Sequence, residues 1–199
     1  MQDYTHFDEH LKDLYEDVYP QPPDELQQQY GEEVINNWLS DLGVENVLDV
    51  GCGQGQFAKA FQNLNIEWNG ITLGSDYDIC ISNGLKTYQG DFTFINWINY
   101  PHYNLVFARH VLEHSPFPIL TLMEWNRICN GFLCVILPNP DGLISESHVG
   151  AYKGRNHYSV MTKEHFTWLG ERAGWRVVKF EENDFEMRFL LEKSQKVRE

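Results

Sequence analysis

The sequence predicts an α/β protein with a doubly wound, mostly parallel sheet of seven strands and helices on both faces. Two observations carry this prediction. From residue 44 onward, short apolar runs alternate with segments of helical periodicity, which is the pattern of a parallel sheet with crossover helices. The chain has 199 residues, of which 42% are hydrophobic, so a single domain with a substantial core is expected.

The first 43 residues (1–43) are expected to form a helical cap segment ahead of the α/β domain at 44–199. Apolar side chains in residues 6–18 recur at the spacing of one helical face. A second helix is expected over residues 32–39, and Gly43 is a plausible left-handed cap beyond its end.

Buried strands are expected where a short apolar run is bounded by glycine, proline or a polar turn. These runs are residues 47–50, 68–73, 85–89, 103–108, 131–137, 175–180 and 185–191. The helices expected between them span residues 57–64, 116–129 and 162–173. Parallel strands end at one edge of a sheet, and ligands of open α/β sheets bind outside that edge.

The composition and net charge of the chain argue against some classes of binding partner. Lys and Arg number 15 against 29 Asp and Glu, which gives a net charge of −14. This charge argues against binding to nucleic-acid phosphates or to an anionic membrane surface. No apolar run approaches the roughly 20 residues that cross a bilayer. Most of the acidic excess lies in residues 1–46, where a solvated helical face explains it.

The four cysteines are scattered along the chain, and none forms a pair with zinc-ligand spacing. Cys129 and Cys134 lie in apolar stretches that are typical of a core. Reduced thiols in a cytoplasmic protein are therefore expected rather than disulfides.

The strongest motif lies at the end of the first expected strand and reads Val-Leu-Asp-Val-Gly-Cys-Gly-Gln-Gly over residues 47–55. Its three alternating glycines remove the side chains where the chain turns, so a flat ligand can approach the backbone closely. The helix that follows offers free N–H groups to a carboxylate or phosphate. The GxGxG spacing differs from the GxGxxG fingerprint of dinucleotide-binding proteins.

This motif resembles motif I of class I S-adenosylmethionine-dependent methyltransferases. A later stretch, residues 103–114, resembles the type 11 branch, which acts on small molecules. The resemblance covers residues 44–195 and implies the Rossmann-like methyltransferase fold, with S-adenosylmethionine as cofactor. It implies that the cofactor-binding residues of the first turn are Asp49, Gly51, Cys52, Gly53 and Gln54.

The second strand departs from the family pattern, in which it usually ends in an Asp or Glu that binds the ribose hydroxyls. Here the strand runs into Leu73, Gly74 and Ser75, and the acidic residue is missing from its place. These three residues are still expected to line the cofactor site, because relatives similar to cyclopropane fatty-acid synthase share the Thr-Leu ending. The sequence leaves Ser75, Asp76 and a backbone group open as the ribose partner.

Two further strand ends match the family order. The resemblance implies that Asp91 accepts a hydrogen bond from the adenine amino group and that Phe92 offers its backbone N–H to the ring. A simple Gly-Asp turn is the alternative for this segment. After the fourth strand, Arg109 and His110 open a stretch similar to the His-x-x-Glu-His of the type 11 branch, and both are expected beside the cofactor.

The acceptor is expected to be a small polar metabolite or sugar, methylated on oxygen or nitrogen. Amino-group methyltransferases of DNA carry an Asp/Asn-Pro-Pro-aromatic motif where this chain has Ala-Arg-His-Val, and the Pro-Cys nucleophile of cytosine enzymes is absent there. Two alternatives remain: a protein or lipid methyltransferase, and a donor-binding protein without turnover that acts as a regulatory or partner subunit. The oligomeric state is not specified by the sequence.

Three histidines are candidates for a catalytic base, because a neutral imidazole has its pKa near working pH. They are His110, His114 and His157, although Glu113 and His114 fit a loop-ordering role equally well. The long insertion at residues 138–160 and the N-terminal segment are expected to fold over the site. No metal ion is expected, because no paired carboxylates stand where catechol-type enzymes hold magnesium.

Overall fold

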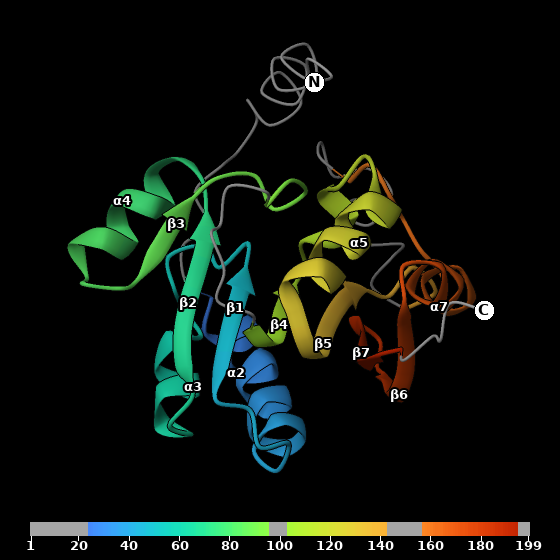
Figure 1. Cartoon of the computed structure of the whole chain (residues 1–199), viewed down its shortest axis with the longest axis horizontal. Coiled ribbons are helices and arrows are strands. Elements are labelled where there is room, and N and C mark those ends of the chain that lie inside the picture. The colour runs from blue at the N-terminus through green and yellow to red at the C-terminus, as the bar shows by residue number, and fades with distance from the viewer. Residues whose placement is uncertain (1–23, 96–102, 143–156, 195–199) are drawn as a thin grey trace.

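A computed structural model describes residues 24–95, 103–142 and 157–194 of the chain. Its centre is a seven-stranded sheet in the order β3-β2-β1-β4-β5-β7-β6 (Figure 1). The strands are β1 Asn46–Val50, β2 Glu67–Thr72, β3 Thr87–Gln89, β4 Tyr103–Arg109, β5 Cys129–Pro138, β6 Trp175–Glu182 and β7 Glu186–Lys193.

The sheet reverses direction near one edge. β1 pairs in parallel with β2 and β4, and the β2–β3 and β4–β5 pairs are parallel as well. β7 lies between β5 and β6 and is antiparallel to both. The expected doubly wound, mostly parallel sheet of seven strands is therefore confirmed. Because β7 runs backwards, its first residue, Glu186, pairs with Pro138 at the carboxyl end of β5.

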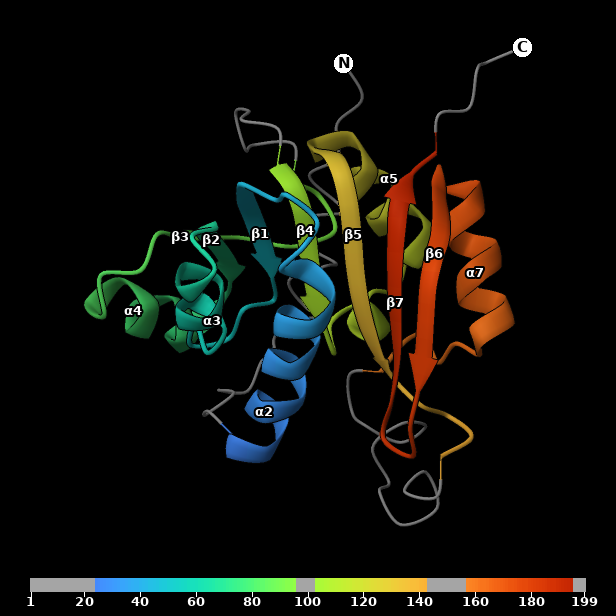
Figure 2. The same cartoon turned by 90° about the horizontal axis from the view of Figure 1, so that it is seen from below.

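Helices cover both faces of the sheet (Figure 2). Strand side chains alternate between the faces, so Leu105 and Phe107 join one apolar core and Val106 and Ala108 join the other. The first core contains side chains of α2 Glu25–Val34, the π-helical turn η1 Ile35–Leu39, α3 Ala58–Asn63 and α4 Gly74–Ser82. The second contains side chains of α5 Pro118–Ile128 and α7 Lys163–Arg172.

The helix expected over residues 32–39 begins earlier than its apolar pattern indicates. α2 starts after Asp24, whose carboxylate accepts a 2.8 Å hydrogen bond from the backbone N–H of Gln27. Its first turns are polar, and burial begins only with Gly31 and Val34 and continues in the turn that follows. The helix expected over residues 6–18 lies outside the described residues, and the domain boundary expected at residue 44 stays a prediction.

α4 was not expected from the sequence. The apolar side chains among its residues, Gly-Ser-Asp-Tyr-Asp-Ile-Cys-Ile-Ser, form no helical stripe. Leu73 is extended and Gly74 has a φ of 61°, so the chain turns sharply between β2 and the helix. Only Asp76 and Cys80 of this helix are buried, and both point to the glycine turn after β1 described below.

All four cysteines are free thiols and all four are buried, as the sequence indicated. Among the described residues, no helix has both the length and the apolar character that crossing a membrane requires.

Candidate active site

The glycine turn follows β1 at the carboxyl edge of the sheet. Gly51 has a φ of 64°, and a Cβ on it would lie 2.4 Å from Cγ2 of Val111. Both the backbone conformation and the space therefore require glycine here. The backbone N–H of Cys52 donates to Ile71 O of β2 at 3.1 Å, which fixes the start of the turn between two strands. The result is backbone that a ligand can approach without meeting a side chain.

Asp49 lies beneath this turn and is almost fully buried. Its Oδ2 accepts a 3.0 Å hydrogen bond from the indole Nε1 of Trp68 on β2. Burial raises the pKa of Asp49 to about 8, although the hydrogen bond from Trp68 opposes the rise. The carboxyl group is therefore mostly protonated at pH 7, and a cation placed above the turn would favour its ionised form.

α4 supplies a second carboxylate to the turn. Asp76 is 4% exposed, and its Oδ1 accepts a 3.1 Å hydrogen bond from Nε2 of Gln54. One turn later, the thiol of Cys80 lies 3.3 Å from the backbone oxygen of Gly53. The strand end itself is more open, since Leu73 is half-buried and Gly74 and Ser75 are exposed. Of the acidic and hydroxyl groups left open by the sequence, Asp76 is the one that contacts the turn.

Asp91 and Phe92 follow β3 at the same edge of the sheet, and both are half-buried. Oδ1 of Asp91 accepts a 2.6 Å hydrogen bond from the backbone N–H of Thr93. The backbone oxygen of Phe92 accepts a 3.0 Å bond from the indole Nε1 of Trp125 on α5. These bonds order the loop after β3 at the carboxyl edge of the sheet.

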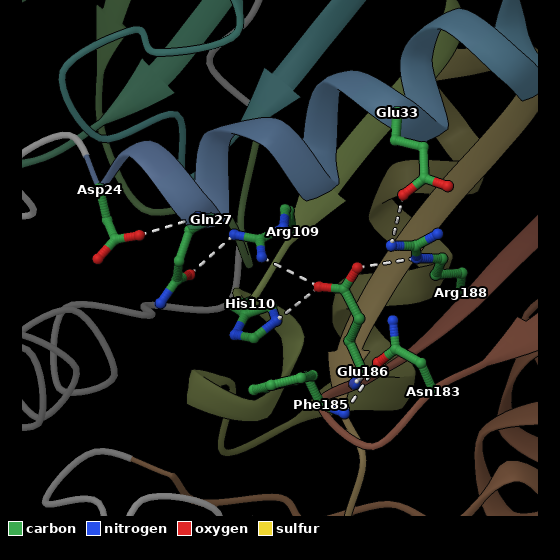
Figure 3. Close-up of polar contacts among 9 residues, drawn as sticks. All are labelled: Asp24, Gln27, Glu33, Arg109, His110, Asn183, Phe185, Glu186 and Arg188. Carbon is green, nitrogen blue, oxygen red and sulfur yellow. Dashed lines mark hydrogen bonds and ion pairs between the residues drawn. The ribbon is translucent and has the colours of Figure 1, made fainter.

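A buried carboxylate joins the end of β4 to β7 and α2 (Figure 3). Glu186 has no exposed surface, and its Oε2 accepts a 3.0 Å hydrogen bond from Nη2 of Arg109. Its Oε1 accepts a 2.8 Å bond from Nε of Arg188. Nε2 of His110 lies 3.5 Å from Oε2. Arg109 also donates from Nη1 to the side-chain oxygen of Gln27 at 2.9 Å, so its guanidinium group is largely directed into this cluster.

The cluster fixes the charges at the end of β4. Burial raises the pKa of Glu186, but His110 and the guanidinium groups outweigh this effect and bring that pKa to about 2. Burial lowers the pKa of His110 below its ordinary value, although Glu186 opposes the change. At pH 7 the glutamate is therefore ionised and the imidazole is neutral. His110 also has a φ of 53°, a strained conformation of the kind that clusters at functional sites.

The other two histidines lie together, near Glu113. The rings of His114 and His157 stand edge to face with their centroids 4.7 Å apart. Glu113, in the 3-10 turn η2 Leu112–His114, is 2% exposed. Burial raises the pKa of Glu113 to about 8. The three predicted base candidates thus divide into His110 beside Glu186 and a pair beside Glu113.

A comparison with models of protein families shows the family to which the chain belongs. The family model described as methyltransferase domain matches residues 19–179 of the chain.

The chain belongs to this methyltransferase family.

It is a class I S-adenosylmethionine-dependent methyltransferase domain, and S-adenosylmethionine is its cofactor, as the sequence motif implied.

Solved structures show the same fold at low sequence identity. Magnesium protoporphyrin IX methyltransferase from Synechocystis, with bound S-adenosylhomocysteine, is 13% identical, with a TM-score of 0.67 over 96% of this chain and 95% of that chain. A putative sarcosine dimethylglycine methyltransferase from Galdieria sulphuraria is 13% identical, with a TM-score of 0.68 over 98% and 100%. No curated protein matches the sequence.

Sequence reasoning missed several buried polar residues at this edge of the sheet. Glu186 and Arg188 lie in an apolar strand, and their spacing of two places both charges on one face. A pair of opposite charges inside an apolar strand was the available signal for a buried ion pair. Gln27 and Trp68 gave no such signal, because their partners are distant in the sequence and only the folded chain brings them together.

We expect Glu186→Gln to lower the free energy of unfolding at pH 7 by about 3–5 kcal/mol, because it leaves Arg109 buried without a counter-charge and Arg188 with only the ion pair to Glu33 at 3.4 Å. The pKa of Glu186 is about 2 in the folded protein and near 4.5 in the unfolded chain. The wild type therefore keeps its full advantage above pH 4.5 and loses it progressively toward pH 2. Urea unfolding at a series of pH values measures this difference.

The matched control is Glu181→Gln, which changes an exposed glutamate on β6 and should stay within about 0.5 kcal/mol of wild type. A Glu186→Gln difference that did not change between pH 5 and pH 2 would contradict the assignment of the pKa to this carboxylate.

Proposed function

We propose that this methyltransferase transfers a methyl group to oxygen or nitrogen of a small polar metabolite or sugar. The observation that carries the proposal is the neutral, half-buried His110 at the end of β4, beside the glycine turn. Methyltransferases of DNA amino groups carry their Pro-Pro-aromatic motif at that place instead. The net charge of −14 also favours a small acceptor over a nucleic acid.

The residues at the sheet edge fit S-adenosylmethionine. The turn of Gly51, Cys52, Gly53 and Gln54 presents backbone where any larger residue at position 51 would clash. We assign the ribose hydroxyls to Asp76, because it is the carboxylate that contacts this turn. We assign the adenine ring to Asp91 and the backbone N–H of Phe92. Arg109 acts indirectly in this proposal, by holding Glu186 and α2 in place.

The mechanism needs alignment of the two reactants and removal of one proton. When bound, S-adenosylmethionine supplies the methyl group, and its sulfur leaves as a neutral thioether. For a hydroxyl acceptor, His110 takes the proton that the oxygen loses. Glu186 faces Nε2 of this imidazole at 3.5 Å, which favours the tautomer protonated at Nε2 and leaves Nδ1 as the proton acceptor.

Two relatives support a small acceptor, since magnesium protoporphyrin IX and sarcosine dimethylglycine appear in the names of methyltransferases with this fold. A donor-binding protein without turnover was favoured only by the missing acid at the end of β2, and Asp76 offers a substitute for it. We also propose a cytoplasmic location, because the four buried thiols fit a reducing compartment.

The acceptor class is tested by incubating the protein with methyl-labelled S-adenosylmethionine and three separate fractions: small metabolites, proteins and lipids. We expect label in the small-metabolite fraction only. Label confined to protein or lipid would replace the proposal by the alternative enzyme classes. Donor binding without label in any fraction would favour a binding protein.

We expect S-adenosylmethionine binding at pH 7 to release close to one proton. The pKa of Asp49 is about 8, so its carboxyl carries a proton in the free protein, and the cationic donor beside it favours the carboxylate. Affinity should therefore rise with pH up to about 8. Calorimetric titrations in buffers of different ionisation enthalpy count the protons released.

Asp49→Asn keeps the size of the side chain and an acceptor for Trp68, and it should abolish the proton release. Asp78→Asn, at an exposed position on α4, is the control and should release protons as wild type does. A wild-type binding enthalpy that is independent of the buffer would show that Asp49 does not ionise on binding.

We expect His110→Ala to reduce kcat on an oxygen acceptor by about 10²–10⁴-fold, which is the usual contribution of a general base. Steady-state kinetics on the acceptor found above measures the loss. His165→Ala, at an exposed position on α7, should leave kcat unchanged. If His110→Ala keeps turnover within about threefold of wild type, the base assignment is wrong.

A further inference from the structure

Three side chains of the types that bind metal ions lie close together, near the proposed base His110. We propose that Glu113, His114 and His157 bind a divalent first-row transition-metal ion, and that this ion also contacts the methyl acceptor. The ligand atoms of all three residues lie within 4.8 Å of one another. The expectation of no metal ion rested on paired carboxylates, and this group contains one carboxylate and two imidazoles instead.

The chain fixes this group with hydrogen bonds across two distant segments. The backbone N–H of Ser159 donates to Glu113 O at 3.0 Å, and its hydroxyl donates to Ser115 O at 2.9 Å. These bonds hold the segment that follows β5 against the turn η2, and they place His157 over His114. Two residues far apart in the sequence are therefore positioned together by backbone contacts as well as by their own rings.

Glu113 supplies the independent sign of a missing cation. It is 2% exposed, and within the described part of the chain neither carboxylate oxygen has a hydrogen-bond partner. Together with His157, Ser159 and Met161 it lines a small pocket at the end of β5. A buried polar group without a partner is costly, so a buried carboxyl group is usually hydrogen-bonded, ion-paired or bound to a metal. A cation between Glu113 and the two imidazoles supplies the missing partner.

The donor set indicates the class of ion. Imidazole ligands suit zinc, iron, cobalt and nickel, whereas magnesium and calcium prefer oxygen ligands. Ligands about 2.0–2.2 Å from one ion lie about 3.0–3.6 Å apart, so the group contracts by about an ångström on binding. Both histidines are half-buried, which leaves their side chains room for that adjustment.

Three protein ligands leave coordination positions open, as in catalytic rather than structural metal sites. Glu113 and His114 lie in the turn η2, which follows His110 after one residue, Val111. An acceptor hydroxyl bound to the ion would thus lie near the methyl donor, with its acidity increased. This role of the ion rests on the proposed function, whereas the binding of the ion does not.

The test uses the full chain without an affinity tag, because a histidine tag would itself bind metals. The protein is dialysed against a chelator and then titrated with Co²⁺, whose visible absorption bands report coordination, and with Zn²⁺ in competition. We expect one ion per chain. Glu113→Gln, which keeps the size of the side chain, and His157→Ala should each weaken binding about tenfold or more. His165→Ala is the matched control and should bind as wild type does.

Circular dichroism and thermal melting confirm that each variant is folded. Absence of stoichiometric Co²⁺ and Zn²⁺ binding, or equal binding by wild type and both ligand variants, would overturn the site. Calorimetry with S-adenosylmethionine on the chelated protein separates the two proposals. Donor binding without ion binding overturns the metal site alone. If the wild type binds the ion and the ligand variants do not, the metal site is supported even when no acceptor is methylated. Absence of methylation would instead count against the proposed function.

Discussion

The buried carboxylate of Glu186 is the interaction on which the arrangement of the site depends. It is the shared counter-charge of Arg109 on β4 and Arg188 on β7. Both arginines also contact α2. Arg109 donates a hydrogen bond to Gln27, and Arg188 forms an ion pair with Glu33 at 3.4 Å. An arginine buried without a counter-charge is strongly destabilising, so β4, β7 and α2 depend on one another for their relative positions. The backbone conformation of His110 is maintained inside this arrangement.

The topology of the sheet explains why the Glu186 cluster lies at the same edge as the glycine turn. Five parallel strands bring the ends of β1, β2, β3 and β4 to one edge, where the residues that we propose to bind the cofactor follow them. The reversal at β7 then brings the start of an antiparallel strand to the same edge, and with it Glu186. One strand order therefore explains why the proposed donor site, the base candidate and the proposed metal ligands lie at the same edge of the sheet.

Most of the fold was predictable because apolar runs and the glycine motif are local signals. The strand limits agree with the sequence pattern to within two residues at every end, and α7 lies within the helix expected over residues 162–173. α4 was missed because its apolar side chains form no helical stripe, so Asp76 was one of three candidates for the ribose partner but was not placed on a helix. The Glu186 cluster was also missed, since pairing between Gln27, Arg109 and Glu186 is set by contacts between distant segments. The residues next to each side chain in the sequence do not indicate such contacts.

A crystal structure of the complex with S-adenosylhomocysteine tests the account most directly. The product is predicted to lie over Gly51–Gln54, with its ribose facing Asp76 and its adenine ring beside Asp91. The Arg109–Glu186 pair is predicted to remain intact, and His110 to stay beside it. Product bound away from the glycine turn, or an Arg109 that leaves Glu186 to bind the product carboxylate, would contradict the account.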